Sequence, residues 1–205
     1  MDFAKIIPMS IVMIAGPQLL SAIFLATTEE WRRNSLAFVA GAGISITAIV
    51  SVAYFLGVGA TSGDSSSDTL YIIVLVLLVL IALRTFVKRA ESTPPKWMGR
   101  LEEANPGFSF KLGFLLLGVF PTDILTSFAV GGFLANGGEP WFHLLPFLAT
   151  TLFLLALPFL TVLAFGARAK AALPKVRDWM NNNSWVVSEV VVLFFIAITI
   201  DSLVG

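Results

Sequence analysis

The sequence contains no cysteine among its 205 residues, and His143 is its only histidine. The missing thiols exclude disulfides, thiolate metal sites and thiol-based electron transfer, and one histidine cannot form a histidine metal cluster. Thirteen basic residues balance thirteen acidic ones, so the net charge favours neither nucleic acid nor an acidic partner. The sequence also lacks paired catalytic acids, a nucleophile with its base and a cofactor motif. We therefore expect no enzyme, no metal site and no cofactor.

Apolar residues, in contrast, are abundant: they make up 57% of the chain and give a mean hydropathy of +0.90. About 20 apolar residues cross a bilayer as a helix, and continuous runs predict helices because backbone groups must be satisfied inside lipid. The first run lacks the basic leader of a signal peptide, so we expect it to be retained. The six predicted spans are Ile6–Ala26, Ser35–Ala60, Thr69–Val87, Leu112–Ala135, Trp141–Gly166 and Trp185–Val204.

The basic residues predict how these spans are oriented. Twelve of the thirteen lie in or beside the first, third and fifth connections. By the positive-inside rule, these connections face the cytoplasm and both termini face outward. The twelve residues are Arg32, Arg33, Arg84, Lys88, Arg89, Lys96, Arg100, Lys111, Arg168, Lys170, Lys175 and Arg177.

The third connection, residues 88–111, is the longest. Within it Trp97, Met98 and Leu101 are spaced three or four residues apart, on the face opposite Glu102 and Glu103. This spacing predicts a short amphipathic helix on the inner membrane surface. The alternative is a solvated linker.

The two halves of the chain resemble each other, although three spans per half make the second half enter the membrane from the opposite side. Ala15–Phe24 in the first span and Val119–Phe128 in the fourth both place a proline near mid-span. A polar residue, aliphatic residues and a small hydroxylated residue follow each proline. Proline-interrupted spans at corresponding places in inverted halves indicate a transporter's central site. We therefore predict two inverted three-helix repeats in one transmembrane domain, 1–87 and 112–205, joined by the linker 88–111.

Asp123 is the most unusual residue of these spans, because a charged side chain at the centre of a bilayer costs roughly 2.5–3.5 kcal/mol on insertion scales. If the interrupted helices meet, Gln18 and Asp123 can share hydrogen bonds with the carbonyls of Met13 and Leu117, which lose their donors to proline. Asp123 then either carries a proton that drives transport or, while protonated, holds two helices together. The candidate substrate or coupling residues are Pro17, Gln18, Ser21, Pro121, Thr122, Asp123, Thr126 and Ser127.

Several short motifs resemble a known family. Pro95-Lys-Trp-Met-Gly-Arg-Leu101, Asn105-Pro-Gly, Lys111-Leu-Gly113 and Phe120-Pro-Thr-Asp123 are similar to the GAP family. Its members are the peptidoglycolipid (sulfolipid) addressing proteins of actinobacteria, within the lysine-exporter (LysE) superfamily. The resemblance implies six helices in two inverted repeats and export across the cytoplasmic membrane of a prokaryote. It is also compatible with a homodimer. The chain departs from the family pattern at Phe120, where the pattern has Asn.

The expected function is therefore a secondary exporter that works by alternating access and moves a lipid or glycolipid towards the cell surface. Its partners would be the bilayer, the substrate and protons. Two alternatives remain open. One is an exporter of a small polar solute such as an amino acid, and the other is a membrane assembly subunit that transports nothing.

Overall fold

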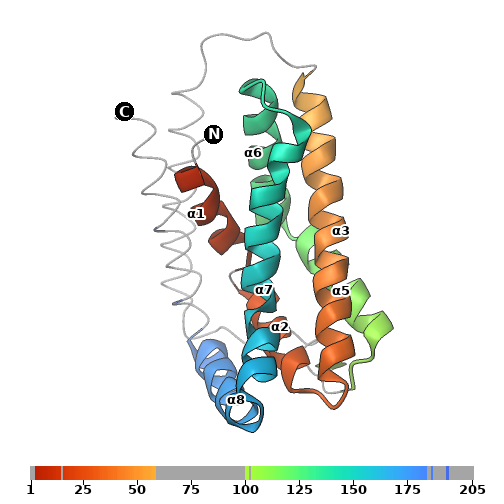
Figure 1. Cartoon of the computed structure of the whole chain (residues 1–205), viewed down its shortest axis with the longest axis vertical. Coiled ribbons are helices and arrows are strands. Elements are labelled where there is room, and N and C mark those ends of the chain that lie inside the picture. Colours follow the sequence, from red (N-terminus) through yellow and green to blue (C-terminus); the bar gives the residue numbers. More distant parts are fainter. Residues whose placement is uncertain are drawn as a thin grey trace. The chain divides into compact units, whose positions relative to one another are not determined.

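The computed structural model describes residues 3–14, 16–58, 100–101 and 103–183, together with 186 and 193. Every regular element in these ranges is a helix, which confirms the all-helical prediction (Figure 1). The described residues belong mainly to one compact unit, Met1–Thr61 with Lys96–Asp178. The helices are α1 (Phe3–Ile14), α2 (Pro17–Thr27), α3 (Trp31–Val58), α5 (Pro106–Val119), α6 (Pro121–Asn136), the short η2 (Trp141–Leu144), α7 (Leu145–Phe165) and α8 (Ala167–Asn182).

Two stretches of helix are long and apolar enough to cross a membrane on their own, Trp31–Leu56 and Trp141–Phe165. The pair α5 and α6 makes a third if it is counted as one broken span, bent by 66°. The described residues thus form a helical membrane protein with two or three candidate spans. The predicted spans 69–87 and 185–204 fall outside the described residues, apart from 186 and 193, so the total of six stays a prediction. Most of the predicted interfacial helix at 94–106 lies outside them too.

Two predicted spans are broken, and a proline follows each break. α1 ends at Ile14, and Gly16 has a φ of 94°, a backbone conformation that favours glycine. Pro17 is the first residue of α2. At this position a backbone N–H makes no hydrogen bond within the helix, so proline's missing N–H costs nothing. α5 ends at Val119, and Phe120 is extended (φ −65°, ψ 129°), as residues before proline tend to be. Pro121 opens α6 in the same way.

α3 packs most extensively against α5 and α6, and glycines let the backbones approach closely. A Cβ added at Gly41 of α3 would collide with the carbonyl oxygen of Phe110, and one added at Gly113 of α5 would collide with that of Phe38. On α6, a Cβ at Gly131 would lie 2.6 Å from the carbonyl oxygen of Val50. α3 therefore supports both halves of the broken span α5–α6.

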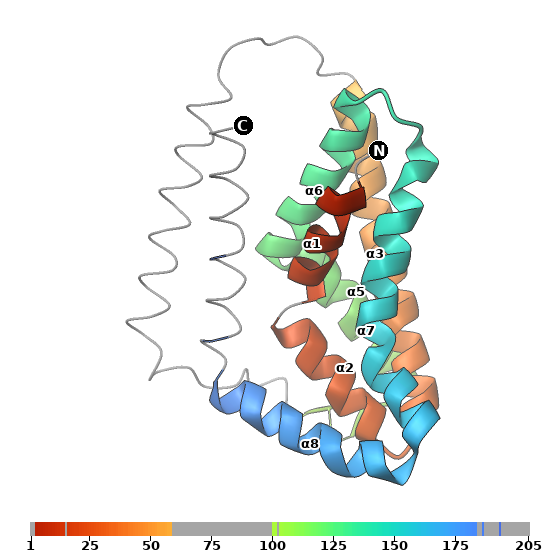
Figure 2. The same cartoon turned by 60° about the vertical axis from the view of Figure 1, so that its left-hand side comes forward.

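α1 packs mainly against α7, whereas α2 packs against both α7 and α3. Ser10 Oγ of α1 donates to the carbonyl oxygen of Phe147 on α7 at 3.5 Å. At its far end α7 stops at Gly166, whose φ of 56° lets the chain turn into α8. Figure 2 shows that α8 runs across the end of α7 instead of continuing its direction. The sequence predicted only a basic connection here, so this helix was missed.

Candidate functional site

The two helix breaks lie next to each other in space, because the first turns of α2 and α6 are in contact. Gln18 Nε2 of α2 donates a hydrogen bond to Asp123 Oδ2 of α6 at 2.5 Å. Each of these residues is only 1% exposed. The bond joins residues 105 positions apart in the sequence and connects the two spans that the proline pattern singled out.

The hydroxyl side chains around this bond fall into two kinds. Ser21 Oγ donates to the carbonyl oxygen of Pro17 at 2.6 Å, and Thr126 Oγ1 donates to that of Thr122 at 2.8 Å. These two hydroxyls are thus satisfied within their own helices. Ser127 is fully buried, and its Oγ has no hydrogen-bond partner among the described residues. The same holds for Oε1 of Gln18.

The remaining predicted site residues contribute less directly. Thr122 is exposed, and its Oγ1 lies 3.5 Å from Asp123 Oδ1, a long hydrogen bond. Pro17 and Pro121 act through the backbone by starting the two half-helices. The structure thus brings Gln18 and Asp123 together, with Ser127 one helical turn from Asp123.

The expected hydrogen bonds from Gln18 and Asp123 to the carbonyls of Met13 and Leu117 are not among those that the described residues form. Gln18 and Asp123 bind each other instead. The reason is geometric: α1 and α5 end before the prolines, so both polar side chains belong to the following helices. Because each helix is fully interrupted and not merely kinked, the side chains of Gln18 and Asp123 belong to a new helix and do not point back to the carbonyls of Met13 and Leu117.

The electrostatic character of the site comes from helix N-termini and one carboxyl group. Neither α2 nor α6 has a side-chain cap at its N-terminus, and the N-terminal end of a helix carries a partial positive charge. Among the described residues, none of the buried polar side chains is Lys, Arg or His, and no three His, Cys, Asp or Glu side chains gather around a possible metal ion. The site can therefore exchange hydrogen bonds with a polar group, or hold a proton on Asp123.

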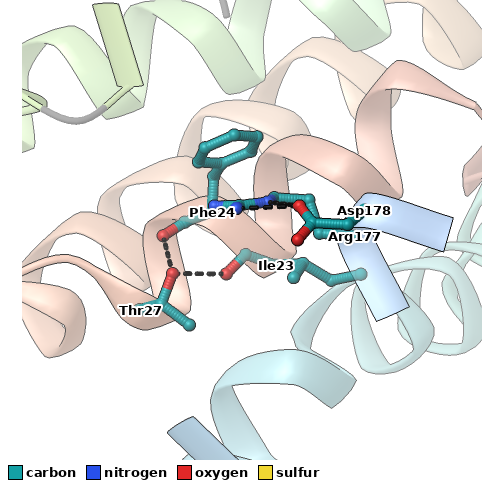
Figure 3. Close-up of polar contacts among 5 residues, drawn as sticks. All are labelled: Ile23, Phe24, Thr27, Arg177 and Asp178. Atoms are coloured by element: carbon teal, nitrogen blue, oxygen red, sulfur yellow. Dashed lines mark hydrogen bonds and ion pairs between the residues drawn. The ribbon is translucent and has the colours of Figure 1, made fainter. Parts of the chain in front are cut away.

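A second group of side chains, which the sequence did not reveal as a cluster, lies where α2, α3, α7 and α8 meet. The ring of Trp31 lies 5.6 Å from that of Phe159, centroid to centroid. The guanidinium carbon of Arg177 on α8 lies 4.3 Å from the ring centroid of Phe24 on α2, and Arg177 also pairs with Asp178 (Figure 3). Apolar residues every three or four positions in 169–180 were the available signal for α8.

These observations define a class of protein: a helical membrane protein in which two proline-initiated half-helices meet through a buried amide–carboxyl hydrogen bond. Comparison with protein-family models matches residues 6–202 to the family described as Sap, sulfolipid-1-addressing protein. The chain belongs to this family, which confirms the resemblance drawn from the short motifs. Neither a curated protein nor a solved structure matches the chain significantly.

Proposed function

We propose that the protein is a secondary exporter of the prokaryotic cytoplasmic membrane, working by alternating access and moving a lipid or glycolipid towards the cell surface. Membership of the sulfolipid-addressing family supports a lipid-related role. The observation that carries the mechanism is the hydrogen bond between Gln18 and Asp123, because it joins two broken helices inside an apolar bundle. Broken helices with polar first turns are typical of substrate or ion sites at the centre of transporters.

The packing supports the proposed inverted repeat. The first predicted span, α1 with α2, packs on the fifth, α7, while the fourth, α5 with α6, packs on the second, α3. In a three-plus-three repeat, the first span corresponds to the fourth and the second to the fifth. The contact of spans one and five therefore corresponds to the contact of spans four and two, as a two-fold relation between the repeats requires. Both broken spans also start their second half with proline. The six-span topology, with both termini outside, and a homodimer complete the proposal.

In the proposed cycle, Asp123 binds and releases a proton as access alternates. Its carboxyl group lies in an apolar bundle, where a charge costs roughly 2.5–3.5 kcal/mol, and Gln18 is its short hydrogen-bond partner. An opening that separates α2 from α6 would break this bond and admit water to the carboxyl group. The proton would then be exchanged with the side that is open at that moment.

The test is transport of an NBD-labelled glycolipid in proteoliposomes, followed by dithionite quenching under an imposed pH gradient. Asp123→Asn keeps an oxygen that can accept from Gln18 Nε2 and removes the exchangeable proton. We expect this variant to lose the stimulation by the pH gradient. Thr151→Val is the matched control, because Thr151 is also fully buried but donates within its own helix and lies outside the candidate site. Unchanged, pH-dependent transport by Asp123→Asn would rule out the coupling role.

Cargo class is tested in cells that lack the gene, by lipidomics of the surface and measurement of exported solutes together. Loss of a surface glycolipid supports the lipid exporter. Accumulation of a small polar solute inside the cells would favour the solute exporter instead. If neither changes while a membrane complex is lost, the protein is an assembly subunit.

A further inference from the structure

A groove of about 380 Å³ lies at the end of α7, where the chain turns into α8. Trp31 and Arg32 from the start of α3 line one part of it, and Leu163, Gly166 and Lys170 line another. The groove is distinct from the Gln18–Asp123 site and shares no residue with it. It lies at the end of a candidate membrane span, Trp141–Phe165, which is where the proposed topology expects lipid headgroups.

The indole of Trp31 gives this groove a fixed wall. Trp31 packs against a core cluster formed by Ala26 of α2, Val162 of α7 and Ala169 of α8. Its ring also lies 5.6 Å from that of Phe159. Residues of three other helices, α2, α7 and α8, thus pack against this one side chain. Tryptophan is also enriched where membrane spans reach the interface.

Two cations are gathered around this one ring. The guanidinium carbon of Arg32 lies 5.1 Å from the ring centroid of Trp31, and Lys170 Nζ lies 5.4 Å from it. The two charged groups are thus at most 10.5 Å apart, the sum of 5.1 Å and 5.4 Å, and salt screens their repulsion only in part, because the Debye length is about 8 Å at physiological ionic strength. Neither Arg32 nor Lys170 forms a salt bridge with an acidic side chain among the described residues.

Two neighbouring basic residues have an acidic partner, whereas Arg168 and Lys175, like the two groove cations, form no salt bridge among the described residues. Arg33 lies within 3.9 Å of Glu30, and Arg177 within 2.9 Å of Asp178. The first turn of α8, which begins beside the groove, contains no acidic residue either. Arg32 and Lys170 are set apart because both lie on the Trp31 ring and line the groove, so an anion held there would be neutralised by the two together.

We propose that this groove binds an anionic phospholipid of the inner leaflet, with the phosphodiester between Arg32 and Lys170. The glycerol and acyl chain would follow the apolar wall at Leu163, which is 56% exposed. A free phosphate ion would make no use of this wall, whereas a lipid uses both parts. Anionic lipids enrich the cytoplasmic leaflet and are attracted by basic residues near its surface. The choice of leaflet rests on the orientation proposed above.

Native mass spectrometry of the full chain in detergent tests this, with dioctanoyl-phosphatidylglycerol as the anionic probe and dioctanoyl-phosphatidylcholine as the matched zwitterionic one. We expect one tight phosphatidylglycerol site and weaker phosphatidylcholine binding. Each basic residue near an anionic lipid contributes about fivefold in affinity. The double variant Arg32→Gln, Lys170→Gln should therefore lose at least tenfold in phosphatidylglycerol affinity. Both side chains are exposed, so we expect its melting temperature to stay unchanged.

The matched control removes two charges from the same two helices but outside the groove, Arg33→Gln with Lys175→Gln. We expect its affinity to stay within twofold of the parent. An equal loss in both double variants would mean diffuse surface attraction and would overturn the proposal. So would equal binding of the two lipids. Competition by glycerol 3-phosphate at the same concentration as the lipid would instead identify a soluble phosphate as the ligand.

Discussion

The hydrogen bond between Gln18 and Asp123 can be tested energetically by a double-mutant cycle with Gln18→Leu, Asp123→Leu and the double variant. Each single change leaves the other buried group without its partner. The double change replaces both by apolar groups of similar size. The losses in unfolding free energy of the two single variants should therefore add up to more than the loss in the double variant. A buried polar group left without its partner costs more than removing both members of the pair.

The expected magnitude follows from the burial of the two residues. Leaving a buried polar partner unsatisfied costs roughly 1–3 kcal/mol in soluble proteins. Side-chain hydrogen bonds between membrane helices average about 0.6 kcal/mol, with a maximum of about 1.7 kcal/mol, because the separated groups often find other partners. Here both residues are 1% exposed, and the side chain of Asp123 has, among the described residues, only the long contact to Thr122 besides Gln18. We therefore expect a coupling of about 1–1.5 kcal/mol, towards the upper end of the membrane range.

Steric trapping of reversible unfolding in bicelles measures this coupling. Thr151→Val combined with Gln18→Leu is the control cycle, because Thr151 is fully buried but donates to Phe147 within its own helix. Its effects should add within about 0.5 kcal/mol. Additive effects in the Gln18–Asp123 cycle as well would refute the view that this bond joins the two broken helices.

Three further outcomes are expected. In thermal melting experiments, Gly41→Ala should lower the free energy of unfolding by about 1–3 kcal/mol, because its Cβ would meet the α5 backbone. Gly132→Ala has open space around its Cβ and should be neutral or slightly stabilising in the same experiments. Gly16→Ala should cost on the order of 1–3 kcal/mol through its φ of 94°, and a normal melting temperature would contradict the observed break. A cysteine introduced at Ser66 should react with an impermeant maleimide in intact cells, and one at Lys175 only after permeabilisation; the reverse would invert the proposed orientation.

The sequence was most informative where one residue type by itself determines the backbone conformation. Proline at 17 and 121 predicted the two interruptions, because a missing N–H and a fixed φ act regardless of the neighbours. The similarity of the two proline segments also placed Gln18 and Asp123 in one candidate site, although it predicted bonds to backbone carbonyls and not the bond between the two side chains.

Other features depended on tertiary contacts that no local pattern contains. Phe120 carries no signal of its own for a complete break, so the expected bonds to Met13 and Leu117 carbonyls were wrong in detail. α8 was missed because its basic residues were interpreted only as a sign of orientation. The clustering of Arg32 and Lys170 on Trp31 joins residues more than a hundred positions apart, which spacing along the chain cannot indicate.

The glycine contacts of α3 also determine where this molecule can bend. Where backbone touches backbone, as at Gly41 and Gly113, no side chain can change rotamer to let one helix slide along the other. α3 and α5 therefore behave mechanically as one body, and the contact at Gly131 adds α6 to it. Gly43 of α3 differs, because a Cβ added there would meet the flexible side chain of Leu152 on α7 at 3.1 Å and not a backbone atom. A rotamer change can relax this contact, so α3 is held less tightly to α7 than to α5 and α6.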